Sequence, residues 1–184
     1  VHAAMPTSRA RRICPAAIIV PGRHHRYREV SHEVMEIVHS ITDRVEVLSI
    51  DEAFLDVAGA QRRLGSPVEI AALLRERVRD EVGVPASVGI ASTKHVAKLA
   101  TTYAKPDGML LVSEDQTIPF LHHLNVGAMW GVGETTRAAL ESKGVRTVEQ
   151  LAHTPPETLA RWLGPALAHR LHERSVIRIF QVEA

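Results

Sequence analysis

Two adjacent carboxylates, Asp51 and Glu52, are the residues whose types and spacing most clearly point to chemistry. They join two short apolar runs, residues 44–50 and 53–58, whose composition predicts a tight pair of β-strands. If both strands are packed on both faces, two charges at their junction cost several kcal/mol unless a cation compensates them. Mg²⁺ suits that role, because it takes oxygen ligands and needs only one or two carboxylates. The alternative is an exposed hairpin turn with solvated side chains, and spacing alone favours this alternative.

The lysines are a second group of candidates, because three of the four in the chain fall within twelve residues. Lys105 lies in the segment Ala-Lys-Pro-Asp-Gly, residues 104–108, where proline and glycine must end a helix and turn the chain. A lysine held at such a turn can present its charge to phosphates, or it can simply stabilise the carboxyl terminus of the helix. Lys94 and Lys98 are one helical turn apart, so they either line a DNA-facing surface or are plain solvated side chains.

A third candidate is the segment of Gly131, Val132 and Gly133, in which two glycines flank a valine. An apolar stretch precedes it, and Glu134 opens a predicted helix after it. Glycines let the backbone approach a phosphate closely, and the amino terminus of a helix supplies free N–H groups that bind it. Such contacts position nucleic acid without reading its bases. The alternative is an ordinary turn between two helices.

The elements that must position these residues alternate between helix and strand over the first 112 residues. Hydrophobic spacing and turn residues predict, in order, helices over 8–13 and 24–41, strands over 44–50 and 53–58, a helix from 67 to about 82, a strand over 86–91, a helix over 93–104 and a strand over 109–112. Thr7 is expected to cap the first helix, and Ser66 to form a capping box with Glu69. One further strand at the start would complete the order βαββαβ of a ferredoxin-like sheet.

From about residue 113 the sequence changes to short capped helices without a strand run. Thr147 with Gln150 and Thr154 with Glu157 both fit the spacing of a capping box. The sequence therefore predicts an α+β fold, in which an incomplete ferredoxin-like sheet is followed by a small all-helical unit of about 60 residues.

Composition limits the class of protein. The 184 residues are 45% hydrophobic and 23% charged, which excludes a disordered tail or a low-complexity linker. No apolar run reaches the roughly 20 residues that a membrane-spanning helix needs, so no membrane partner is expected. A single cysteine, Cys14, cannot form an internal disulfide, which favours the cytoplasm.

The formal net charge of +1 conceals blocks of opposite sign. Residues 1–28 hold six arginines and no acid, whereas residues 29–85 hold twelve acids and six bases. Residues 86–106 hold three lysines and no acid. Acidic and basic stretches kept apart suit a site that binds both metal ions and phosphates, although solvated helix faces would look the same.

The segment around the carboxylate pair, Ser-Ile-Asp-Glu-Ala-Phe-Leu-Asp, closely resembles the palm motif of Y-family DNA polymerases, specifically the bacterial DNA polymerase IV group. Other stretches match in family order: Ala-Met-Pro-Thr and Ala-Arg-Arg-Ile-Cys-Pro within residues 4–15, Tyr-Arg-Glu-Val-Ser at 27–31, Ser-Val-Gly-Ile-Ala at 87–91, Ala-Lys-Leu-Ala at 97–100, Ala-Lys-Pro-Asp-Gly at 104–108 and Trp-Gly-Val-Gly at 130–133. The resemblance covers about residues 1–173.

The resemblance implies a division of the chain into the end of the fingers (1–22), an incomplete catalytic palm (23–112), a thumb with a helix-hairpin-helix (113–175) and an atypical tail (176–184). The family's first palm strand, most of its fingers and its little-finger domain have no counterpart here. We therefore expect a fragment that is, alone, a poor polymerase or an inactive one.

The resemblance also implies roles for single residues. Asp51 and Glu52 become catalytic carboxylates that bind two Mg²⁺ ions, Lys105 contacts the triphosphate, and Gly131, Val132 and Gly133 bind DNA. The implied reaction is error-prone translesion synthesis, in which a dNTP is added to the primer 3′-hydroxyl of a primer–template DNA. The sliding clamp is an expected partner of the full-length protein. The alternatives are a non-catalytic DNA-binding module that retains the hairpin and, less favoured because it needs no DNA-gripping hairpin, a nucleotide cyclase.

Overall fold

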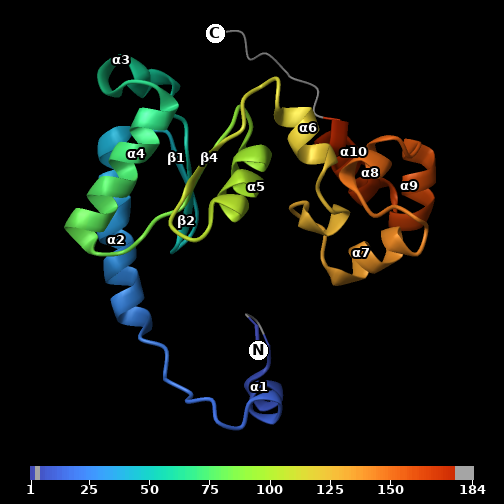
Figure 1. Cartoon of the computed structure of the whole chain (residues 1–184), viewed down its shortest axis with the longest axis horizontal. Coiled ribbons are helices and arrows are strands. Elements are labelled where there is room, and N and C mark those ends of the chain that lie inside the picture. Colours follow the sequence, from blue (N-terminus) through green and yellow to red (C-terminus); the bar gives the residue numbers. More distant parts are fainter. Residues whose placement is uncertain (3–4, 177–184) are drawn as a thin grey trace.

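Two helices open the chain in the computed structural model, which describes residues 1–2 and 5–176. Helix α2 (His24–Ile41) matches its predicted range and buries Ile37, Val38 and Ile41. Helix α1 (Thr7–Ile13) buries no residue and is joined to α2 by an extended segment (Figure 1). Thr7 does not cap α1 as predicted, because it is itself the first helical residue and Pro6 stands before it.

The strands form two separate pairs among the described residues. Strands β1 (Val45–Ser49) and β2 (Glu52–Leu55) are antiparallel, with an irregularity in register near the turn. Strands β3 (Val88–Ile90) and β4 (Met109–Leu111) are parallel. The predicted strands are all present but longer than those observed, and β2 begins one residue before its predicted range. The two pairs do not join into one sheet among the described residues.

Helix α4 (Pro67–Arg77) packs against α2 on one side of the strands (Figure 1). It follows a 3₁₀ turn (Ala58–Ala60) and the short α3 (Gln61–Leu64). The predicted capping box is confirmed, since Ser66 and Glu69 bond to each other's backbone amides. A π-helical turn (Val78–Val82) extends α4 to Gly83, whose φ of +78° ends it.

Helix α5 (Lys94–Ala104) packs on β3 and β4, and a glycine makes this packing possible. A Cβ atom on Gly89 would lie 2.0 Å from the carbonyl oxygen of Ala97. The Gly89 amide instead donates a hydrogen bond of 2.9 Å to the hydroxyl of Thr101. The glycine of the Ser-Val-Gly-Ile-Ala motif therefore lets the helix that bears Lys98 lie directly on the strand.

The remaining described residues, up to 176, are mostly helical, as predicted. After β4 they form α6 (Thr117–His122), a 3₁₀ turn (Val126–Ala128), α7 (Glu134–Glu141), α8 (Val148–Ala152), α9 (Pro156–Leu163) and α10 (Pro165–Val176). The capping box of Thr147 and Gln150 is confirmed. That of Thr154 is wrong: Pro155 holds the cap position, and the Thr154 hydroxyl donates back to the carbonyl of Gln150.

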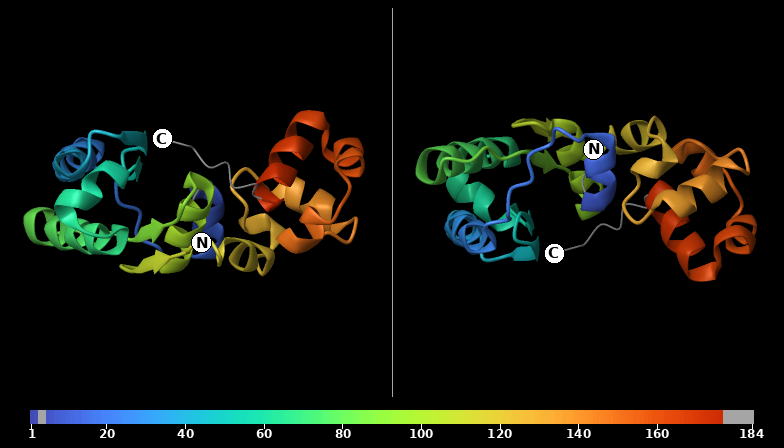
Figure 2. Two further views of the ribbon diagram at one scale, coloured as in Figure 1. Left: turned by 90° about the horizontal axis from the view of Figure 1, so that it is seen from above. Right: turned by 90° about the horizontal axis from the view of Figure 1, so that it is seen from below.

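The larger hydrophobic core crosses the expected boundary at residue 112. Val96, Leu99 and Ala100 of α5 belong to the same buried cluster as Leu121 and Leu171 of the helical unit. A smaller cluster joins α2 to α4 through Ile41, Ala60 and Ile70. Figure 2 shows α2 and α4 at one end of the molecule, the helical unit at the other, and the strands with α5 between them.

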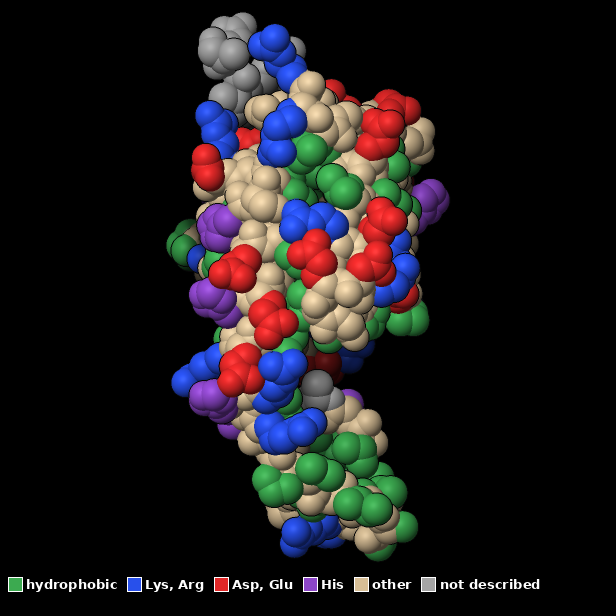
Figure 3. Space-filling view, turned by 90° about the vertical axis from the view of Figure 1, so that its left-hand side faces the viewer, with side chains coloured by type: hydrophobic (Ala, Val, Ile, Leu, Met, Phe, Trp, Pro, Cys, Tyr) green, Lys and Arg blue, Asp and Glu red, His purple; other side chains and the backbone are tan. Residues whose placement is uncertain are grey.

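The outer face over α2 and α4 carries acidic, basic and histidine side chains without a dominant sign (Figure 3). Hydrophobic side chains gather at the end of this face formed by the N-terminal segment, which exposes Ile13, Ile18, Ile19 and Val20. In the part of the chain that the structure describes, no helix is long and apolar enough to cross a membrane.

Candidate active site

The carboxylate pair lies at an exposed β-hairpin turn. Ile50 and Asp51 form the turn, and Glu52 is the first residue of β2. The expectation that both strands are packed on both faces is wrong for the described residues, among which β1 pairs with β2 alone and Val47 is 52% exposed. Desolvation therefore does not by itself demand a cation here. The Asp51 carboxylate accepts a hydrogen bond of 2.5 Å from the hydroxyl of Ser49.

Two lysines of α5 connect this hairpin to the rest of the molecule. The Lys98 ammonium donates to a carboxylate oxygen of Glu52 at 2.7 Å, and Lys94 pairs with Glu46 of β1. Lys98 is only 27% exposed. The two lysines thus form ion pairs with the hairpin, which neither interpretation of their spacing anticipated.

Trp130 extends this contact to the glycine hairpin. The Lys98 ammonium lies 5.4 Å from the centre of the Trp130 ring, and the Arg174 guanidinium lies 5.2 Å from it. Both distances suit cation–π attraction. Phe54 of β2 contacts the same ring, with 6.1 Å between ring centres. Glu52, Lys98 and the start of the Gly131 turn are therefore brought together.

The glycine hairpin has the features expected of a phosphate-binding turn. Gly131 has a φ of +95°, which strains any residue with a side chain. Gly133 holds the N-cap position of α7, and no side chain caps that helix. Its first amides are thus available to an anion. A groove of about 320 Å³ adjoins the turn, lined by Trp130, Gly131, Leu167, Arg170, Leu171 and Arg174.

Lys105 lies at the carboxyl-terminal end of α5. It is exposed, it follows the last helical residue, and in the described part of the chain its ammonium forms no ion pair. Seven residues separate it from Lys98, which is about 10 Å along a helix axis. Helix α5 thus links the two predicted parts of the site, because Lys98 within the helix contacts Glu52 and Lys105 follows its last residue.

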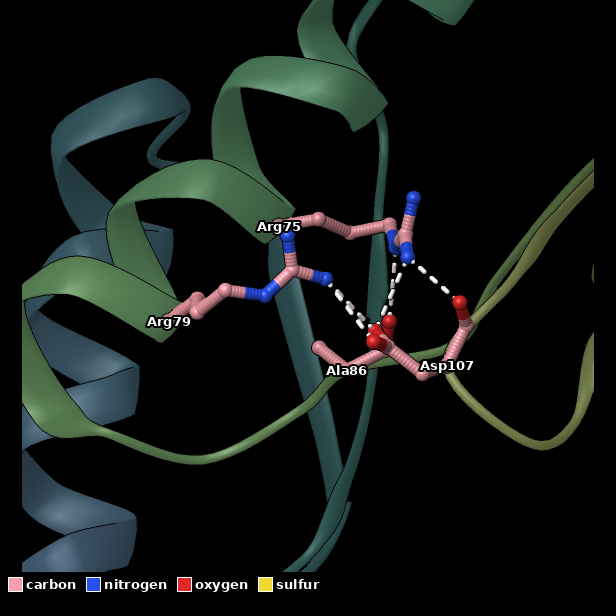
Figure 4. Close-up of polar contacts among 4 residues, drawn as sticks. All are labelled: Arg75, Arg79, Ala86 and Asp107. Carbon is pink, nitrogen blue, oxygen red and sulfur yellow. Dashed lines mark hydrogen bonds and ion pairs between the residues drawn. The ribbon is translucent and has the colours of Figure 1, made fainter.

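The turn after Lys105 is held by two arginines that the sequence did not reveal (Figure 4). Arg75 donates to the Asp107 carbonyl oxygen at 2.6 Å and to its carboxylate at 2.9 Å. Arg79 donates to both carboxylate oxygens of Asp107, at 2.9 and 2.8 Å. Hydrogen bonds from Arg75, and then from Arg79, hold the pKa of Asp107 below its ordinary value.

The donor chemistry of Asp51 and Glu52 fits Mg²⁺. Two adjacent carboxylates supply hard oxygen ligands, and this ion commonly completes its shell with water and substrate phosphates. Among the described residues no group of three or more His, Cys, Asp or Glu side chains is arranged to hold a metal. The pair therefore fits an ion that phosphate oxygens help to bind.

Comparison with known proteins shows the family of the chain. A family model described as the impB/mucB/samB family matches residues 1–102. The chain belongs to this family. The resemblance to Y-family DNA polymerases drawn from the motifs is thereby confirmed.

Several relatives of this impB/mucB/samB protein carry DNA polymerase names. "DNA polymerase IV 2" of Mesorhizobium japonicum is 43% identical over 171 residues, which are 93% of this chain and 41% of that protein. "DNA polymerase IV" of Desulfatibacillum aliphaticivorans is 43% identical over 164 residues, or 89% and 41% of the two chains. The chain thus spans less than half the length of these curated relatives.

Solved structures give the same picture of the fold. The crystal structure of DinB from Sulfolobus solfataricus superimposes with a TM-score of 0.87 at 28% identity, over 96% of this chain and 52% of that one. The insertion ternary complex of Dbh DNA polymerase gives a TM-score of 0.85 at 28% identity, over the same shares. The described α+β architecture is therefore that of polymerases of this kind.

His95 is a further buried polar residue of this family member, and it is not among the residues singled out from the sequence. It is 8% exposed, and neither ring nitrogen has a hydrogen-bond partner. Burial, together with the nearby charge of Arg174, lowers the pKa of His95 to about 4. Its place beside the apolar positions of α5 was the available signal, because a histidine there must be buried with the helix face.

Proposed function

We propose that this chain forms the central part of a Y-family DNA polymerase that carries out error-prone, template-directed translesion synthesis. The observation that carries the proposal is the joint placement of the Asp51–Glu52 pair, the lysines of α5 and the glycine hairpin around one helix. The family match and the polymerase relatives support it. Nucleotidyl transfer needs carboxylates for a metal, a cation for phosphates and a surface for DNA.

The proposed division keeps the end of the fingers at 1–22, the palm at 23–112 and the thumb at 113–175. Beyond the last residue of α10, the proposed tail lies outside the described residues. One further strand, first in the order of elements and lying in space between β2 and β3, would join the two strand pairs into one ferredoxin-like palm sheet. The order of the elements supports this arrangement, since it is the ferredoxin-like order without its first strand.

The proposed roles follow from the chemistry of each group. Asp51 and Glu52 would hold Mg²⁺, two ions in the complete site, and the metal would supply acidification of the primer 3′-hydroxyl and stabilisation of charge on the phosphate. Lys105 attracts the triphosphate of the incoming dNTP. Lys98 neutralises Glu52 while no metal competes for it. Gly131, Val132 and Gly133 bind the DNA backbone through amides, without regard to base sequence.

The proposed partners are primer–template DNA and a dNTP, as a relative solved as an insertion ternary complex suggests. The sliding clamp stays a prediction for the full-length protein. A cytoplasmic location is proposed from the single cysteine and from the bacterial polymerase IV relatives.

Primer extension by a graft, a chimeric polymerase that contains this chain, tests the proposal. The matching segment of the Mesorhizobium japonicum polymerase would be replaced by this chain, and Mg²⁺-dependent incorporation would be measured. We expect Asp51→Ala to reduce extension by about 100-fold or more while DNA affinity changes little, because a metal ligand acts on chemistry rather than on the duplex. Asp80→Asn, an exposed carboxylate beyond α4, is the matched control. A folded graft that binds DNA without extending a primer would favour the non-catalytic DNA-binding module.

A further inference from the structure

Arg75 anchors the turn that carries Lys105, although it touches neither Lys105 nor the carboxylate pair. We propose that Arg75 is a positioning residue which acts through Asp107, with help from Arg79, to fix the direction in which Lys105 meets a triphosphate. This inference rests on the proposed role of Lys105 in nucleotide binding.

Arg75 ties together two segments that are distant in sequence. Its Nε donates to the carbonyl oxygen of Ala86 at 2.8 Å, while one Nη donates to the carbonyl and the carboxylate of Asp107 (Figure 4). The amide of Val88 also donates to the carbonyl of Gly108 at 3.0 Å. Arg75 therefore joins the segments leading into β3 and β4. Only the forked guanidinium supplies donors in these fixed directions.

The turn itself adopts a backbone that needs such support. Asp107 has a φ of +45°, a region sparsely populated by residues with side chains. Gly108 packs so closely on the end of α5 that a Cβ atom there would lie 2.3 Å from the carbonyl oxygen of Ala104. The turn is thus held by the arginines on one side and by α5 on the other.

The support of the turn matters for Lys105 because its own side chain has no partner among the described residues. Its backbone therefore sets where the flexible side chain starts and which positions the ammonium can reach. A backbone fixed before the ligand arrives spares the cost of ordering it on binding. Arg75 is 17% exposed in its side chain, so its bonds are better shielded from competing water than those of a surface ion pair.

If the Arg75–Asp107 pair acted on triphosphate binding through charge alone, Asp107→Asn would have the opposite effect to the one that positioning predicts. Asp107→Asn removes a negative charge close to the proposed triphosphate site, so electrostatics alone should tighten binding of an anion. Asparagine tolerates a positive φ, and the substitution leaves the size of the side chain nearly unchanged. Positioning predicts weaker binding instead, because the two ion pairs to Arg75 and Arg79 are lost.

The test measures binding of inorganic triphosphate to residues 1–184 by calorimetry at constant Mg²⁺. We expect Arg75→Ala and Asp107→Asn each to weaken binding about fivefold, as loss of charge-assisted bonds should. Arg77→Ala is the matched control, because Arg77 lies on the same helix but pairs with Glu81 and Ser40. In a Lys105→Ala background, Arg75→Ala should produce no further loss.

Each outcome decides a different point. If the unaltered chain does not bind triphosphate, or if Lys105→Ala has no effect, both the nucleotide role of Lys105 and this inference are contradicted. If binding depends on Lys105 but Asp107→Asn leaves it unchanged or tighter, the inference alone fails. It also fails if Arg75→Ala weakens binding equally with and without Lys105. Circular dichroism confirms that each variant is folded.

Discussion

At the scale of single residues, the lysines of α5 form ion pairs with carboxylates of the β-hairpin. Glu52 is paired with Lys98, and Lys98 in turn lies over Trp130. Lys98 contacts one oxygen of the Glu52 carboxylate, so a metal that takes this oxygen must displace the lysine. The pairing explains how an exposed carboxylate remains oriented toward α5 without a metal.

His95 leads to a prediction about pH at the same scale. Its pKa of about 4 in the folded chain lies below the ordinary value of 6.5, so between these pH values the unfolded chain binds more protons. Stability should therefore be full above pH 6.5 and should fall as the pH drops toward 4, by roughly 3 kcal/mol in total. Replacing the imidazole in His95→Phe should remove this component, which urea unfolding at several pH values measures.

The control for His95 is another histidine. His39 on α2 is exposed and forms no ion pair among the described residues, so His39→Gln is the control substitution. Equal slopes for the unaltered chain and His95→Phe between pH 4 and 6.5 would show that the imidazole is accessible to water or has a partner after all.

At the scale of elements, two similar sequence patterns have different structures. In the capping box of α8, the Thr147 hydroxyl accepts from the amide of Gln150. Thr154 matches the same pattern, yet its hydroxyl donates to a carbonyl of the preceding helix. We expect Thr147→Ala to cost about 1 kcal/mol of stability and Thr154→Ala clearly less. Thermal unfolding of the two variants compares them directly, and a larger loss for Thr154→Ala would contradict the assignment.

Local signals predicted the elements well, whereas contacts distant in sequence were not predictable. The range of α2 and the capping box at Ser66 follow from spacing and side-chain type within a few residues. The exposure of the Asp51 turn depends on which strands cover it, and the Arg75–Asp107 bonds connect residues 32 positions apart. No pattern within one segment could have revealed those bonds, while the roles of the predicted site residues stay predictions.

At the scale of the whole molecule, the expected palm and thumb share one hydrophobic core. Val96, Leu99 and Ala100 come from the predicted palm, yet they are buried in the same cluster as Leu140 and Leu159 of the predicted thumb. A boundary in the order of elements is therefore not a boundary in packing. The helix that carries Lys98 and leads to Lys105 depends for its support on the helical unit.

This shared core predicts that α5 and the helical unit unfold together. Leu99 is 3% exposed, so Leu99→Ala should cost about 3 kcal/mol and should lower amide protection in α8 and α10 as well as in α5. Ile70→Ala is the matched control, because Ile70 is as deeply buried but belongs to the smaller cluster under α2. It should lower protection in α2 and α4 and leave α8 and α10 unchanged. Hydrogen exchange decides the point. If Leu99→Ala leaves amide protection in α8 and α10 intact, α5 and the helical unit are independently stable, and their shared cluster does not couple their unfolding.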